Sequence, residues 1–185
     1  MRLLHIVAFI SACTAQAQIK LSITDAPKQI SILGEGFIST PINERDLALS
    51  PDEKEIFFTI TSPRSDIQTI VYSRQLKTGE WTKPEVVSFA GNYSDLEPAF
   101  SQDGNTLYFA SNRPLEGNTP KDFDIWKVTR EGSGWSKPVN LGAPINTSED
   151  EFYPSITKSG NLYFTANYKE QGIGREDIYR AEWQE

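Results

Sequence analysis

Apolar residues recur along this chain in short alternating runs, and the same arrangement of runs appears three times. Each copy consists of a short strand, a polar turn, and a second strand rich in aromatic residues. The copies occupy residues 46–59, 97–110 and 153–165. No stretch of about 10–15 residues places apolar side chains at helical intervals, which disfavours a parallel α/β fold. The pattern predicts an all-β chain built from repeated hairpins.

Small polar residues encode the turn of each hairpin. In the second copy, Ser101, Asp103 and Gly104 form a Ser-x-Asp-Gly turn. Ser and Asp side chains bond nearby backbone groups, and Gly adopts a positive φ without penalty. The aromatic residues that follow suit a pleated, packed surface. Each hairpin is therefore expected to be antiparallel.

Two further strands are expected after each hairpin. The third carries Tyr72, Trp126 and Tyr179, which are 54 and 53 positions apart. The fourth begins at Trp81 and again at Trp135, also 54 positions apart, and each has a Pro three residues later. Pro cannot donate to a central ladder, so this strand belongs at an edge. Four strands per repeat, with an edge strand last, are typical of a β-propeller blade.

The repeat divides the chain into units. Residues 32–40 resemble residues 141–147, which follow a fourth strand, so residues 29–33 are interpreted as an orphan outer strand. The expected units are a signal peptide at 1–17 (or a lipoprotein signal at 1–12), an N-terminal segment with the orphan strand at 18–42, and blades at 43–92, 93–147 and 148–185, the last without its fourth strand.

Three blades do not close an ordinary ring, because propellers have about four to eight. The expected fold class is an incomplete β-propeller of three four-stranded antiparallel blades. Three explanations stay open: a truncated gene or fragment, a homodimer that completes the ring, or an open arc. An open arc exposes one blade face, which favours association.

Several motifs resemble a known repeat family. They are Ser50-Pro51-Asp52 leading to Ile56-Phe57-Phe58, Ser101-Gln102-Asp103-Gly104 leading to Leu107-Tyr108-Phe109, and Asp124-Ile125-Trp126. These motifs are similar to the WD40-like β-propeller repeats of bacterial envelope proteins, a type found in the periplasmic propeller of the Tol system. The resemblance covers residues 43–181 and implies six-bladed relatives, whose N-terminal half this chain resembles. It says little about function, since the fold hosts binding proteins, scaffolds and enzyme-attached domains.

The first residues are typical of a targeting segment. Arg2 precedes an apolar run over residues 3–12, and residues 15–17 form a small-x-small cleavage site before Gln18. The run is too short to cross a bilayer as a helix, which takes about 20 residues. In a second interpretation, Cys13 ends a lipobox and becomes the lipidated first residue. Both interpretations predict export, either to the periplasm or to a membrane anchor.

Charge and composition limit the possible partners. The chain has 18 Lys and Arg against 25 Asp and Glu, a net charge of −7, and no basic run. Nucleic-acid binding is not expected, because it needs clustered cations. His5 and Cys13 are the only His and Cys, and both fall in the targeting segment. Loss or lipidation of that segment excludes Ser–His–Asp catalysis, Cys–His catalysis and zinc sites built from His or Cys.

Carboxylates are the remaining reactive groups, and they are concentrated in loops that enter the first strands. In propellers these loops lie near the mouth of the central channel. Three roles stay open for the acids: bonding turn backbone, holding Ca²⁺ through oxygen ligands, or forming a glycosidase acid/base pair. No catalytic residue, metal ligand or cofactor is assigned. The candidate ligand-binding residues are Glu44, Asp46, Asp95, Glu97, Asp150, Glu151, Tyr153 and Arg113.

Four residues recur at fixed blade positions and are interpreted as structural. Asp124 and Asp177 precede the third-strand aromatics Trp126 and Tyr179. We expect each Asp to accept hydrogen bonds from a neighbouring turn. Arg113 is expected either to pair with these Asp residues or to contact a ligand.

These features favour an exported, non-catalytic binding or scaffold module of the bacterial envelope, with an envelope protein or peptide as its partner. The alternative is a carbohydrate-active or hydrolytic enzyme that uses carboxylates or a catalytic part beyond Glu185. Reading the downstream frame discriminates between them, because three more repeats favour a simple propeller and a domain with a Ser nucleophile and a His favours a peptidase.

Overall fold

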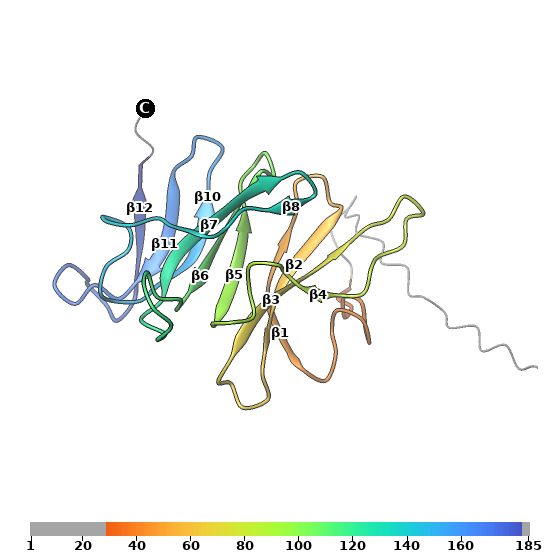
Figure 1. Ribbon diagram of the computed structural model, residues 1–185, viewed down its shortest axis with the longest axis horizontal. Coiled ribbons are helices and arrows are strands. Elements are labelled where there is room, and N and C mark those ends of the chain that lie inside the picture. The colour runs from red at the N-terminus through yellow and green to blue at the C-terminus, as the bar shows by residue number, and fades with distance from the viewer. Residues whose placement is uncertain (1–28, 183–185) are drawn as a thin grey trace, which may run out of the picture.

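The computed structural model describes residues 29–182. The predictions for the first residues, a signal peptide at 1–17 and lipidation of Cys13, lie outside the described residues. The described chain forms twelve strands in three antiparallel sheets, which follow one another along an arc (Figure 1). Within residues 29–182 no helix is long and apolar enough to span a membrane. The fold is an incomplete β-propeller, as the repeat predicts.

The first blade contains four strands in sequence order. The Pro and polar residues between its first two strands form the expected turn, in which Ser50 Oγ accepts hydrogen bonds from the backbone of Lys54 and Glu55 at 3.1 and 2.9 Å. The third and fourth strands pair at only two positions, which keeps the Pro-containing segment at the edge. The strands are β1 (Asn43–Leu49), β2 (Glu55–Thr61), β3 (Gln68–Arg74) and β4 (Glu85–Val86).

The second blade divides its outer strand into two pieces, where the sequence predicts one continuous strand. One piece pairs with Arg130 and Glu131, and the other pairs with Trp126 and Lys127. Pro138 lies between the two pieces and lacks an N–H donor, which explains the interruption. The strands are β5 (Asp95–Phe100), β6 (Thr106–Ser111), β7 (Asp124–Glu131), β8 (Gly134–Trp135) and β9 (Val139–Asn140).

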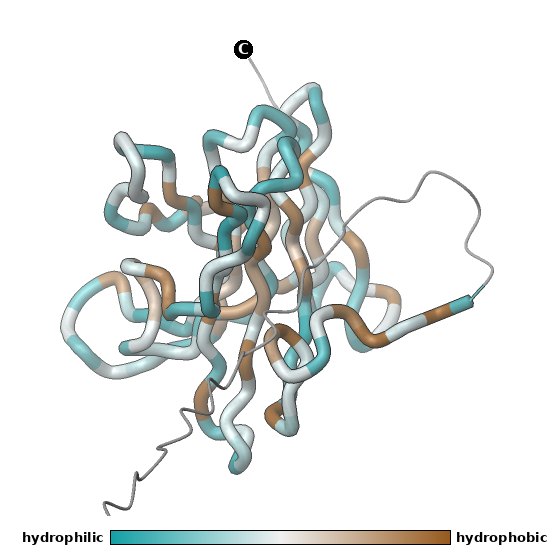
Figure 2. Tube along the Cα trace, turned by 90° about the vertical axis from the view of Figure 1, so that its right-hand side faces the viewer, coloured by the Kyte–Doolittle hydropathy of each residue, from teal (hydrophilic) through white to brown (hydrophobic). Residues whose placement is uncertain are grey.

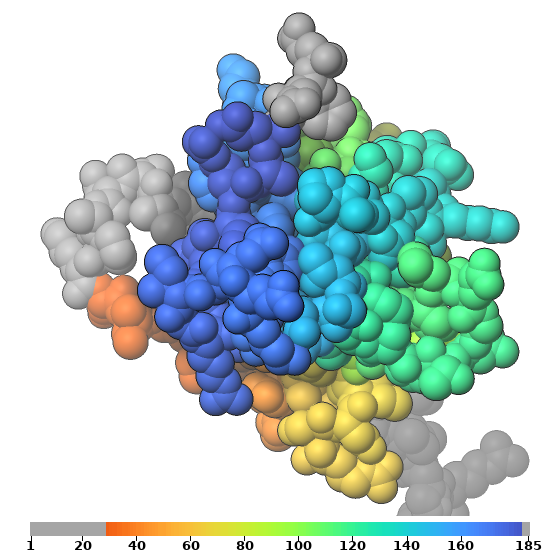
Figure 3. Space-filling model, turned by 90° about the vertical axis from the view of Figure 1, so that its left-hand side faces the viewer, coloured from red at the N-terminus to blue at the C-terminus, as the bar shows by residue number. Residues whose placement is uncertain are grey.

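The third blade has three strands: β10 (Glu151–Ile156), β11 (Leu162–Ala166) and β12 (Asp177–Ala181). Within residues 29–182 the outer edge of β12 has no partner strand, and Figure 3 shows this end of the molecule with β12 at its surface. The predicted orphan strand at residues 29–33 is not formed. The open edge of β12 lies at the other end of the arc from this segment (Figure 1).

Strand register corrects one feature of the repeat. Val71 pairs with Val86 in the first blade, and Trp126 pairs with Asn140 in the second. Trp126 therefore occupies the position of Val71, one residue before Tyr72. The spacing of aromatic residues alone places this strand one residue out of register.

The hydrophobic core lies mainly between neighbouring blades. Phe57 and Ile70 of the first blade pack in one cluster with Phe109 and Trp126 of the second. Phe57 meets Trp135 edge-on, with ring centroids 6.0 Å apart. Many hydrophobic segments accordingly run along the strands inside the body (Figure 2). Packing between blades fixes the positions of the innermost strands β1, β5 and β10.

Candidate functional site

Each innermost strand carries a bulge at the same place. The pairing register shifts between Arg45 and Ala48 in β1, and at the matching positions of β5 and β10. The first bulged residue has a positive φ in all three strands: Asp46 at 58°, Glu97 at 57° and Tyr153 at 52°. Such angles are uncommon for residues other than Gly and cluster at functional sites. Bulges also re-aim side chains.

The three bulges bring side chains from three blades to one open pocket. Its volume is about 300 Å³, and it is lined by Asp46, Leu47, Glu97, Pro98, Tyr153 and Pro154. Arg45 joins this group. Its Nε donates to Asp46 Oδ1 at 2.9 Å, and its Nη2 donates to Glu97 Oε1 at 3.3 Å and to Tyr153 Oη at 2.7 Å. We call Arg45, Asp46, Glu97 and Tyr153 the inner-strand cluster.

Glu97 is the buried centre of the inner-strand cluster, with 4 % of its surface exposed. Its Oε2 accepts the backbone N–H of Tyr153 at 2.6 Å, and its own N–H donates to Thr59 Oγ1 at 3.1 Å. Burial raises the pKa of Glu97 to about 7, and the nearby Asp46 charge adds to this, while the Tyr153 N–H and Arg45 oppose it. This carboxyl can therefore gain or lose a proton near neutral pH.

Three other predicted site residues form a separate structural row. Glu44, Asp95 and Glu151 each precede a bulged residue by two positions. Each accepts a hydrogen bond from the backbone N–H four residues earlier, at 3.1, 3.4 and 3.2 Å respectively. They therefore bond the loops that enter the innermost strands. Burial also raises the pKa of Glu151 to about 7.

Arg113 forms its ion pair with Asp95 and bonds two further groups. Its Nη2 donates to Asp95 Oδ1 and to the Phe89 carbonyl oxygen, and its Nε donates to Ser111 Oγ at 2.9 Å. Its guanidinium also lies 5.1 Å from the centroid of the Phe109 ring. The structure pairs Arg113 with the fully buried Asp95, and not with Asp124 or Asp177 as expected, because strand pairing places Asp95 opposite Ser111, two residues before Arg113.

The recurring Asp residues bond their own blades. Asp177 accepts the backbone N–H groups of Ile173 and Gly174 at 2.7 and 3.1 Å, as the sequence predicts. Asp124 instead accepts the side chain of Asn140 at 2.7 Å and forms an ion pair with Lys121 at 2.8 Å.

Two more of the predicted residues pack in the core and one bonds a loop. Trp126 is buried in the cluster between the first two blades, and Tyr179 packs partly buried against Phe164. Asp150 accepts the Phe123 N–H at 2.9 Å.

The inner-strand cluster does not form a ready cation site. Among residues 29–182 there is no group of three or more His, Cys, Asp or Glu side chains that could hold a metal ion. Asp46 and Glu97 come together, but the Arg45 guanidinium bonds both carboxylates. The donor set therefore does not fit the calcium alternative, which needs about six to eight oxygen ligands.

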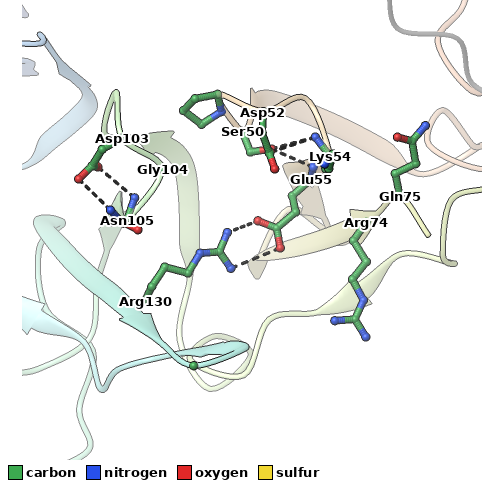
Figure 4. Close-up of a pocket in the computed structure, with 12 residues that line it drawn as sticks. Ser50, Asp52, Lys54, Glu55, Arg74, Gln75, Asp103, Gly104, Asn105 and Arg130 are labelled. Atoms are coloured by element: carbon green, nitrogen blue, oxygen red, sulfur yellow. Dashed lines mark hydrogen bonds and ion pairs between the residues drawn. The ribbon is translucent and has the colours of Figure 1, made fainter. Parts of the chain in front are cut away.

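A larger groove lies between the hairpin turns of the first two blades (Figure 4). Its volume is about 480 Å³. The ion pair between Arg130 and Glu55 crosses it, and the Arg130 guanidinium lies 3.9 Å from the Trp135 ring centroid. Asp52 is bonded by the Ser50 hydroxyl at 2.7 Å. These polar groups stabilise the turns and the contact between blades, so we place the candidate site at the inner-strand cluster instead.

Arg45 is the member of the cluster that sequence reasoning missed. The matching positions of the other two blades hold Leu96 and Phe152. A charged residue at a position that is apolar in the other repeats is the signal that marks it. Of the predicted ligand-binding residues, only Asp46, Glu97 and Tyr153 meet at the inner-strand cluster, and the others bond loops or their own blade.

Comparisons with known proteins bear on the fold. No family model and no curated protein matches the chain. Among solved structures, it is similar to TolB from Acinetobacter baumannii, with 20% identity and a TM-score of 0.51 over 78% of this chain and 31% of that one. It is also similar to a putative TolB from Agrobacterium tumefaciens, with 18% identity and a TM-score of 0.52 over 77% of this chain and 46% of that one. The chain thus spans less than half the length of either structure, and the likeness identifies its fold as that of TolB-type β-propeller repeats.

Proposed function

We propose that this protein is an exported, non-catalytic binding module of the bacterial envelope, and that its partner protein or peptide contacts the inner-strand cluster. The observation that carries the proposal is the convergence of Arg45, Glu97 and Tyr153 from three blades on one open pocket. Side chains that come from separate repeats and meet in one place form a surface that no single blade supplies.

The chemistry of the cluster suits recognition of a partner. Tyr and Arg are the residue types enriched at binding hot spots. Half of the Tyr153 surface is exposed, while its backbone and hydroxyl are held by Glu97 and Arg45. A side chain that is already fixed loses little conformational freedom when a partner binds, which favours affinity. A pocket of about 300 Å³ accommodates a side chain of a protein or peptide.

The cellular location is part of the same proposal. The apolar run at residues 3–12 and the cleavage pattern before Gln18 support export. The lipobox interpretation adds a membrane anchor at Cys13. A Cys13→Ser variant tests the anchor: loss of membrane association with export retained supports it, and unchanged membrane association contradicts it.

Capture from solubilised envelope extract tests the binding function. The immobilised wild-type chain should retain a defined protein or peptide, and Tyr153→Ser should lose most of it. Leu76→Ser is the matched control, because Leu76 is exposed to a similar degree, 44 % against 50 % for Tyr153, and lies outside the cluster. Equal retention by Tyr153→Ser and the wild type would refute the site. Measured turnover of a glycan, with nothing captured, would favour the enzyme alternative.

A further inference from the structure

One position of the repeat is buried in two blades and exposed in the third. This position is on the third strand and is held by Ile70, Ile125 and Ile178. The three are equivalent because the second and third strands pair in the same register in every blade, counted from Ile56, Leu107 and Leu162. Ile70 and Ile125 are 0 % exposed, whereas Ile178 is 80 % exposed. The third blade therefore presents an apolar side chain that the architecture normally covers.

In the first two blades this residue is covered by the connector that follows the outer strand and by the next blade. Ile70 packs in one cluster with Val87 and with Leu107 and Trp126 of the second blade. The backbone N–H of Val87 donates to the Ile70 carbonyl oxygen at 3.2 Å, and that of Leu141 donates to the Ile125 carbonyl oxygen, also at 3.2 Å. Ile125 packs in a cluster with Leu141 and with Ile145 of the connector. Within residues 29–182 no such segment lies along the outer edge of β12.

Residues 33–44 have the structure of a connector. Gly34 has a φ of 55° and its carbonyl oxygen accepts the N–H groups of residues 37 and 38; Gly142 has a φ of 68° and accepts those of residues 145 and 146. The two segments then end in the same loop bond, Thr40 to Glu44 and Thr147 to Glu151. Residues 29–33 thus precede this connector, in the position that an outer strand has before the matching connector of the second blade.

This would-be outer strand is also uncovered. Ile30 is 100 % exposed and Ile32 is 66 % exposed. In Figure 2 the first described residues extend away from the body of the molecule. The described structure therefore contains both halves of one contact between blades. One half is a connector that no described blade precedes, and the other is a third blade that no described connector follows.

We propose that a second copy of this chain joins the two halves, so that residues 30–33 of each copy form the fourth strand of the other copy's third blade. The repeat sets the register. The N–H of Leu33 donates to the Ile178 carbonyl oxygen, as Val87 does to Ile70, and Ile32 lies opposite Tyr179, as Val86 lies opposite Val71. Leu33 and Phe37 then cover Ile178, in the places that Leu141 and Ile145 take over Ile125.

A second copy fits this seam better than the described part of the same chain. Residues 29–33 and β12 lie at opposite ends of one arc (Figure 1). A two-fold axis uses both open edges of both copies in two identical seams, so no edge is left to propagate into a filament. The described blades of two copies number six, which is within the about four to eight that propellers close with.

Disulfide capture tests the register. In a Cys13→Ser background, which removes the one native Cys, Ile32→Cys and Tyr179→Cys are combined. This pair matches Val86 and Val71, a pair without mutual backbone hydrogen bonds, where Cα atoms are about 4.5 Å apart and a disulfide forms readily. Oxidation should convert most of the chain to a covalent dimer. Ser31→Cys with Tyr179→Cys is the control, because a shift of one residue turns the side chain to the other face of the sheet.

Sedimentation equilibrium tests the assembly itself. The wild-type chain should have twice the monomer mass. Ile178→Lys should raise the dissociation constant of the dimer at least tenfold, while the circular dichroism spectrum stays unchanged. Ile173→Lys is the matched control, since Ile173 is fully exposed in a loop outside the seam. A wild-type chain that stays monomeric at every concentration overturns the proposal. A dimer that survives Ile178→Lys, or that fails to form the Ile32–Tyr179 disulfide, also overturns it.

Discussion

Arg45 and Tyr153, 108 residues apart in the chain, meet at the centre of the arc, where the Arg45 Nη2 atom lies 2.7 Å from the Tyr153 hydroxyl oxygen. Arg45 belongs to the first blade and Tyr153 to the third. Glu97 of the second blade bonds both, through its two carboxylate oxygens. This contact links all three blades by side chains, in addition to the apolar packing between them.

The protonation of Glu97 should make stability depend on pH. Its pKa is raised from 4.5 to about 7, so the folded state binds more protons than the unfolded state between these values. The free energy of unfolding should therefore fall as pH rises from about 4.5 to about 7, by about 1 to 3 kcal/mol from this group. Urea unfolding of wild type and Glu97→Gln at pH 5 and pH 8 measures the difference.

The Glu97→Gln variant should lose part of that pH dependence. Glu151, whose pKa is also raised to about 7, and Asp95, whose pKa burial also raises, should contribute to the remainder. Glu170→Gln, at an exposed position, should follow the wild type. Identical pH profiles for Glu97→Gln and the wild type would show that Glu97 is ionised well below pH 7 in the folded chain.

Arg113 should not be replaceable by Lys. Lys retains the charge but cannot bond Asp95, Ser111 and the Phe89 carbonyl oxygen at once. We expect Arg113→Lys to cost about 1 to 3 kcal/mol and Arg113→Ala about 3 to 5 kcal/mol, because Asp95 is then a buried charge without its partner. Chemical denaturation measures both. Arg64→Ala, which breaks an exposed ion pair with Asp66, should change stability by less than about 1 kcal/mol, and a similar loss there would contradict the assignment.

Replacing Glu53 with Gly should stabilise the protein. Its φ is 59°, and the matching turn positions of the other blades are Gly104 and Gly160, with φ values of 72° and 85°. Glu53 is exposed, so Glu53→Gly removes backbone strain with few lost contacts and should raise stability by about 0.5 to 1 kcal/mol. Gly104→Ala should destabilise, since its Cβ would lie 3.3 Å from Pro51 Cδ. A thermal melt in which Glu53→Gly is less stable than the wild type would contradict this account.

Arg130 should matter more than its ion-pair partner Glu55. Both side chains form the bridge between the first and second blades, but the Arg130 guanidinium also lies over the Trp135 ring. We expect Arg130→Ala to cost about 1 to 2 kcal/mol and Glu55→Ala about 0.5 to 1 kcal/mol. A double-mutant cycle isolates the ion pair. Equal losses from the two single variants would mean that the contact with Trp135 contributes nothing.

The strands and turns were predictable because their signals are local. Ser101, Asp103 and Gly104 specify a turn from within five residues, and the structure bonds the Ser101 hydroxyl to Asp103 at 2.6 Å as that motif implies. The repeat then supplies the order of the strands. The edge position of the Pro-containing strand follows from the missing N–H alone.

The inner-strand cluster was less predictable because it depends on the backbone and on distant partners. No Gly marks the bulges at Asp46, Glu97 and Tyr153, so their positive φ values leave no signal in the sequence. Arg113 finds Asp95, 18 residues away, through sheet pairing that residue spacing does not encode. Residues 29–33 carry the pattern of an outer strand, but a strand needs a neighbour, which the described part of the chain does not place beside it.

The three bulges have a consequence for protein engineering. The same backbone geometry holds an Asp, a Glu and a Tyr at equivalent positions, so the scaffold fixes where a side chain points without dictating its chemistry. Positions 46, 97 and 153 are therefore three substitutable positions with the same backbone geometry. Sets of three side chains can be exchanged there to build new recognition sites while the apolar packing between blades is left untouched.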